Sequence, residues 1–188
     1  MVAAVVLVAG VGLSFLLKGR GDDPGNRNSL TQAIPTGPIA LNTLGESEAS
    51  QLYDSTQNIN ALAQETYGDQ YEAMFSSGSV FQVEYSALEP LVISVGWCSL
   101  NQAILEENYG NIELILVFNG QDIPDNDTAV FDQTAGGVAC RERFAVIDHW
   151  DSGTYSVSSA IRILAPIDDG IYEHEEGITK NEYIVTIP

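Results

Sequence analysis

Three clusters of acidic residues contain the side chains best suited to chemistry. Asp122, Asp125 and Asp127 supply oxygen ligands at a loop spacing that could hold Ca²⁺, although the glycine and terminal glutamate of an EF-hand are absent. Residues 148–151 (DHWD) place a histidine between two carboxylates, an arrangement that would suit a general base. Residues 173–176 (EHEE) precede Gly177 and suit either a solvated charge run or a metal site.

The sequence contains none of the common catalytic motifs. G-x-S-x-G, H-E-x-x-H, G-x-G-x-x-G and the P-loop are absent, and no loop pairs a Ser, Cys or Lys nucleophile with a base. We therefore expect no catalytic residues and no cofactor. The three aspartates are interpreted as an ordinary polar loop, and a calcium site is the alternative. A hydrolase would require His149 or His174 in a cleft, within hydrogen-bond reach of a second carboxylate.

Composition favours one acidic domain with accessory segments. The chain has 188 residues, 45% of them hydrophobic and 18% charged, which is enough apolar material for a packed core. Its 26 Asp and Glu against 7 Lys and Arg give a formal net charge of −19. Such a surface repels phosphate backbones, which excludes nucleic acid as a partner. Cationic partners, divalent ions or a salty exterior are compatible with the charge, which alternatively serves solubility alone.

The two cysteines, Cys98 and Cys140, indicate a single disulfide, because an even and minimal count is typical of an exported chain. The alternative is two unrelated buried thiols. Neither cysteine belongs to a C-x-x-C pair, and a zinc site would need more ligands.

The first residues read as a membrane anchor. Residues 1–17 are almost wholly apolar and carry no charged side chain; as a helix they would reach about 25 Å, slightly less than the hydrocarbon core. Lys18, Arg20 and Arg27 follow the span and, by the positive-inside rule, favour a cytoplasmic domain, against the indications from the disulfide and the acidity. We give the downstream domain more weight and expect it outside the cytoplasm. Residues 18–45, rich in Gly, Pro, Asn and Ser, predict a flexible linker.

The periodicity then changes twice. Residues 46–77 carry apolar side chains at steps of three and four, which predicts one amphipathic helix, a stalk or a helix packed on the domain. From residue 79 the period is two. Strands are predicted at 80–86, 91–98, 111–119, 138–148, 153–164 and 181–187, a spacing typical of a β-sandwich.

One short motif connects this pattern to a known superfold. Asp151-Ser-Gly153-Thr-Tyr155 resembles the Asp-x-Gly-x-Tyr tyrosine corner of immunoglobulin-like domains, in which the Tyr hydroxyl bonds back to the backbone. The resemblance covers residues 79–188 and implies an immunoglobulin-like sandwich of about seven strands, closer to fibronectin III or bacterial surface modules than to antibody domains. It also implies that strands 91–98 and 138–148 are antiparallel neighbours. Cys98, which ends the first, would then meet Cys140, which begins the second.

These inferences together predict a non-catalytic, membrane-anchored extracytoplasmic module, mainly β in fold. Its partners would be the membrane, through residues 1–17, and a protein, a glycan or its own copies, bound by sandwich edges or loops. A calcium-dependent adhesive module and a hydrolase based on carboxylates and histidine are the alternatives.

Overall fold

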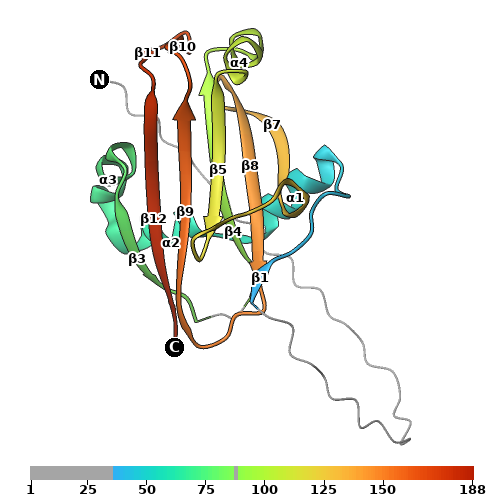
Figure 1. The fold of residues 1–188 in the computed structure, drawn as a ribbon, viewed down its shortest axis with the longest axis vertical. Helices are drawn as coiled ribbons and strands as arrows, with labels where there is room; N and C mark the ends of the chain where they lie inside the picture. Colours follow the sequence, from blue (N-terminus) through green and yellow to red (C-terminus); the bar gives the residue numbers. More distant parts are fainter. Residues whose placement is uncertain (1–35, 87–88) are drawn as a thin grey trace, which may run out of the picture. The chain divides into compact units, whose positions relative to one another are not determined.

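The strands of the described residues form two five-stranded sheets and one separate two-stranded hairpin, and the two larger sheets pack around a common core (Figure 1). The mainly-β prediction is therefore confirmed in its coarse form. The computed structural model describes residues 36–86 and 89–188, which belong to the compact unit Pro35–Pro188. The predicted membrane segment, residues 1–17, lies outside the described residues. Within them, no helix is long and apolar enough to cross a membrane.

In the first sheet, β8 (Val138–Asp148) is the central strand. One edge of β8 pairs antiparallel with β4 (Leu91–Ser99), and the other pairs with β7 (Ala129–Ala135) and the short β1 (Gly37–Pro38). The two-residue β2 (Gln57–Asn58) runs parallel to the start of β4, reaching only to Val92. Beyond Val92, no described strand pairs with the outer edge of β4.

In the second sheet, β9 (Gly153–Ile163) and β12 (Gly177–Ile187) are antiparallel neighbours. On the far side of β9 lies β5 (Ile112–Phe118), followed by the short β6 (Gln121–Asp122). β3 (Val80–Glu84) runs parallel to β12 but pairs only with its last part, residues 182–186. Residues 177–181 of β12 therefore have an outer edge with no strand partner in the described chain.

The two ends of the sandwich carry different elements (Figure 1). The hairpin of β10 (Ile167–Asp168) and β11 (Glu173–His174) and the helix α4 (Gln102–Tyr109) lie at one end. β1 and the C-terminus lie at the other.

The predicted alternation of strand residues places the core between the sheets. The odd-numbered residues of β4 from Leu91 to Trp97 face inward, as do Tyr155, Val157, Ile161 and Ile163 of β9. They meet Phe81 of β3 and Tyr183 of β12, whose rings stack with centroids 5.2 Å apart. Burial of such large side chains is the main favourable contribution to folding.

The prediction of one continuous helix over residues 46–77 is wrong. The segment forms α1 (Glu46–Ser55), α2 (Ile59–Tyr67) and α3 (Tyr71–Ser77), with a 3₁₀ turn, Gly68–Gln70, between the last two. Asn58 starts a new helix because its side chain accepts a hydrogen bond from the Asn60 N–H, and Gly68 has a φ of 53°. The stripe of apolar residues continues through these breaks, which the periodicity alone does not reveal. α1 covers the outer face of the first sheet through Ala49, Leu52 and Tyr53.

One further prediction needs correction, and two elements were missed. The linker prediction extends too far, because within residues 36–45 the strand β1 pairs with β8 and Leu41 is buried in the core under α1. Strand β7 and helix α4 were not predicted. Asn101 caps the start of α4, because its side chain accepts a hydrogen bond from the Ile104 N–H.

The disulfide prediction is confirmed: Cys98 and Cys140 are bonded, directly opposite each other in the β4–β8 register. Tyr155 donates a hydrogen bond of 2.9 Å from its hydroxyl to the backbone carbonyl of Asp151, the contact that the Asp-x-Gly-x-Tyr resemblance implies. Both features lie on the strands that carry the sandwich, so they stabilise its frame.

Candidate functional site

A cleft of about 730 Å³ opens where the two sheets have unpaired edges. We call it the edge cleft. It lies between residues 94–97 of β4 and residues 177–181 of β12. Along β12 it runs from the β11 residues Glu173 and His174 to Phe75 of α3, whose carbonyl accepts a 3.2 Å hydrogen bond from the Asn181 side chain. A hollow of this size, with a strand edge on either side, is suited to an elongated ligand.

The inner wall of the edge cleft is apolar. Val95 and Trp97 of β4 face Ile161 and Ile163 of β9 across the gap between the sheets. Trp97 is 8% exposed, and its indole N–H has no hydrogen-bond partner in the described structure. Since buried polar groups are normally paired, this donor is a group that a ligand could satisfy.

A neutral hydrogen-bond network lies beside α2. The Ser94 hydroxyl receives the side-chain amides of Asn58 and Asn60 at 3.4 and 3.5 Å, and lies 3.3 Å from the Tyr53 hydroxyl. The Tyr183 hydroxyl in turn donates to Asn60 at 2.6 Å. Among the residues that the structure describes, no base contacts Ser94, so the network can orient polar groups of a ligand but does not activate a serine nucleophile.

An acidic side chain of β8 reaches the cleft because the residue opposite it on the edge strand β4 is a glycine. Gly96 lies opposite Glu142 in the β4–β8 register, and the carboxyl group lies so close that a Cβ at Gly96 would be 2.3 Å from Glu142 Oε1. Burial raises the pKa of Glu142 to about 7, and the side chain of Gln133 acts in the opposite direction. Burial also raises the pKa of Tyr53, and the charge of Glu142 adds to that rise. The site therefore holds a carboxyl group that titrates near neutral pH.

At the hairpin end, His174 forms a pair with a buried aspartate. His174 Nε2 lies 2.7 Å from Asp169 Oδ2, and its ring meets Trp97 edge-on at 4.9 Å between centroids. Asp169 Oδ1 accepts the N–H groups of Ile171 and Tyr172, both at 2.7 Å. Burial works to raise the pKa of Asp169, but these three donors outweigh it and lower that pKa below its usual value. Because the Asp169 carboxylate already accepts hydrogen bonds from backbone N–H groups of the turn, we assign it the structural role of fixing the hairpin.

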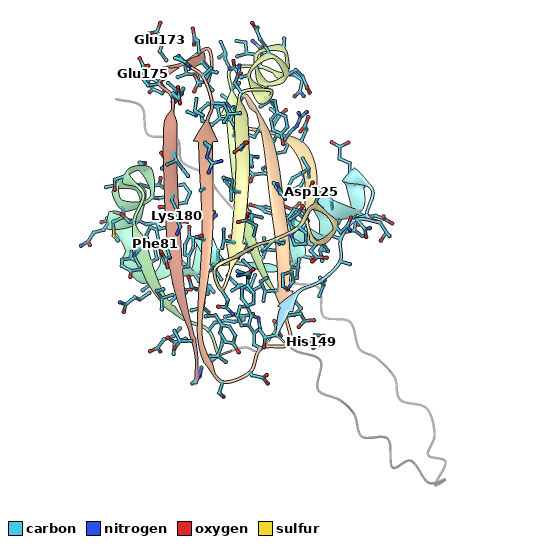
Figure 2. All side chains as sticks on the ribbon, in the orientation of Figure 1. Phe81, Asp125, His149, Glu173, Glu175 and Lys180 are labelled. Atoms are coloured by element: carbon cyan, nitrogen blue, oxygen red, sulfur yellow. A yellow bond between two sulfur atoms is a disulfide. The ribbon has the colours of Figure 1, made fainter. Side chains whose placement is uncertain are left out.

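The other sequence candidates do not assemble into one site. His149 lies at the opposite end of the sandwich from Glu173 and Glu175, as Figure 2 shows. Its Nε2 lies 3.7 Å from Asp148, in a turn where His149 has a φ of 59°. Asp125 binds Arg143 at 2.7 Å. No group of three or more His, Cys, Asp or Glu able to hold a metal ion is found among the described residues, so the calcium hypothesis for Asp122, Asp125 and Asp127 rests on spacing alone.

Sequence reasoning missed most of the edge cleft. Of its residues, only His174 and its neighbouring glutamates were candidates. One signal was present: Gly96 interrupts the apolar run LVISVGWC, and a glycine inside a strand often indicates close approach of another group.

Comparison with known proteins adds little to this picture. No family model matches the sequence, and no curated protein matches it. A solved structure, that of the cysteine protease inhibitor EhICP2 from Entamoeba histolytica, is similar over 60% of this chain and 89% of its own length, with 10% sequence identity and a TM-score of 0.26. A likeness at that level supports no argument about function.

Proposed function

We propose that this chain is a non-catalytic, extracytoplasmic binding module, tethered by residues 1–17, which holds an extended polypeptide segment in the edge cleft. The observation that carries the proposal is the unpaired outer edge of β4 beside an apolar wall. A free strand edge offers a row of backbone donors and acceptors, and peptide ligands commonly add to such an edge as a further strand. The alternating side chains of an added strand would then enter the cleft on one face.

The strand order supports the finer assignment to an immunoglobulin-like sandwich. In one sheet the order is β4–β8–β7, so that residues 91–98 and 138–148 are neighbours as the resemblance implies. In the other sheet the order is β3–β12–β9–β5. In that class of domain, binding by sheet edges and loops is common, because the core is filled by side chains.

Two threonines on β12 provide a matched test. Thr179 is exposed and lines the edge cleft, whereas Thr186 is exposed outside it. The full chain is used to select binders from a random library of peptides of about nine residues, long enough to follow β4. Thr179→Trp should weaken the selected peptides at least tenfold and Thr186→Trp should not. Bound peptide should slow amide exchange at residues 93–97. Peptides that bind both variants equally would place the ligand elsewhere.

A hydrolase is the second candidate, because His174 lies in a cleft within hydrogen-bond reach of Asp169. Against it, no Ser, Thr or Cys side chain bonds to a histidine ring in the described structure. Cleavage of model peptides by the full chain, abolished in His174→Gln, would place this candidate first.

A further inference from the structure

The position of Glu142 gives the edge cleft a chemical preference. Glu142 belongs to β8, one strand inside the sheet, and would normally be shielded by the side chains of the edge strand β4. Gly96 removes that shield, because it has no side chain at the register position opposite Glu142. The carboxyl group therefore lines the cleft at the edge of the sheet.

No cation within the described residues neutralises this carboxylate. The four Lys and Arg side chains there each pair with another acid: Arg141 with Asp132 and Glu106, Arg143 with Asp125, Arg162 with Glu113, and Lys180 with Glu182. None of the four lines the edge cleft, whereas Glu173 and Glu175 do. His174, which lines the cleft, pairs with Asp169. A partly buried carboxylate without a cationic partner is costly, so a ligand that brings a cation gains most at this position.

The geometry of an added strand determines where that cation must be. On the outer face of β4, a side chain level with Gly96 would meet Glu142, with Ser94 and Tyr53 nearby. Its two neighbours along the peptide would point to the opposite face, toward the apolar wall of Trp97 and Ile161. The matching ligand sequence is apolar–basic–apolar.

We propose that the edge cleft selects an extended segment of another protein in which a Lys or Arg, flanked by apolar residues, pairs with Glu142 over Gly96. This inference rests on the proposed function and adds the class of ligand. A second copy of this chain is a poorer occupant, because each copy carries a net charge of −19 and would bring its own Glu142 to the contact.

Charge-matched peptides test the pairing directly. Blocked peptides of about nine residues, alternating Val and Thr with a central Lys, Gln or Glu, are titrated against the full chain by fluorescence anisotropy. The Lys peptide should bind at least tenfold more tightly than the Gln peptide, the scale of one charge-assisted hydrogen bond. In Glu142→Gln this preference should disappear. Glu84→Gln, an exposed change outside the cleft, should retain it.

The possible failures are distinguishable. If Lys and Gln peptides protect β4 amides and bind equally, the pairing with Glu142 is refuted and the peptide-binding function stands. A Lys preference that survives in Glu142→Gln refutes the pairing as well. If no peptide, including those from the random library, protects residues 93–97, the proposed function fails. Sedimentation that shows dimers, with those amides protected without peptide, would make the occupant a second copy and overturn the proposed partner.

Discussion

Replacing Glu142 with Gln should stabilise the folded chain, and the gain should depend on pH. The pKa of Glu142 is about 7, raised from an ordinary value of 4.5 by burial. The folded state therefore binds a proton more tightly than the unfolded state. Below pH 4.5 both states are protonated and Glu142 behaves like the neutral Gln. As the pH rises toward 7, the unfolded state ionises first, and the wild type loses stability relative to the variant.

The magnitude follows from the difference between the two pKa values. A pKa raised from 4.5 to about 7 corresponds to a limit of roughly 3 kcal/mol at high pH. Glu142 is only partly buried, at the mouth of an open cleft, so solvent screening reduces this to about 1–2 kcal/mol. Tyr53 faces the same carboxyl group, and its own raised pKa keeps it neutral throughout this range.

Urea denaturation of both proteins between about pH 4 and pH 8 measures the effect. The difference in unfolding free energy should be near zero at the acidic end and reach its plateau above pH 7. Glu84→Gln serves as the exposed control and should give no such rise. A difference that is constant with pH, or largest in acid, would refute the argument. A carboxylate that lowers stability at neutral pH is consistent with a residue retained for binding.

Four other predictions concern the frame and the setting of the module. Tyr155→Phe removes the hydrogen bond to the Asp151 carbonyl and should lower the unfolding free energy by about 1 kcal/mol; an unchanged denaturation midpoint would contradict this. Reduction of the Cys98–Cys140 disulfide, whose cysteines are 42 residues apart, should lower the unfolding free energy by roughly 4 kcal/mol. Melting with and without reductant measures this change. Millimolar Ca²⁺ should leave the melting midpoint unchanged, whereas an increase would indicate binding to the folded state. Protease added to intact cells should reach residues 36–188, whereas protection would mean the opposite orientation.

The sequence predicted features that depend on local pattern. The inward alternation of Leu91 to Trp97 and the strand after Gly153 follow from residue type and period. The meeting of Cys98 with Cys140 followed instead from the immunoglobulin-like resemblance, which implied that their strands are neighbours. Strand β7 was missed although Gly136-Gly137, both with positive φ, are the residues expected in a two-residue hairpin turn.

The edge cleft could not be predicted in the same way. It exists because β2 ends at Val92 and β3 pairs only with residues 182–186, which leaves two edges free on the same side. Both features depend on strand order, and the residues of β4 do not indicate on their own which strand, if any, pairs with its outer edge. Glu142 likewise reads as an ordinary polar position between Arg141 and Arg143 until Gly96 is placed opposite it.

The attachments of β8 have a mechanical consequence. Tension entering from the N-terminal side first reaches Thr36, which contacts the His149 carbonyl and the Asp151 N–H, and then the two-residue pairing of β1. Tension applied at the edge of β4 is instead carried by a nine-residue ladder to β8 and by a covalent bond at its end. Under load the short pairing of β1 with β8 would therefore separate first, and the β4–β8 ladder that borders the edge cleft would stay intact.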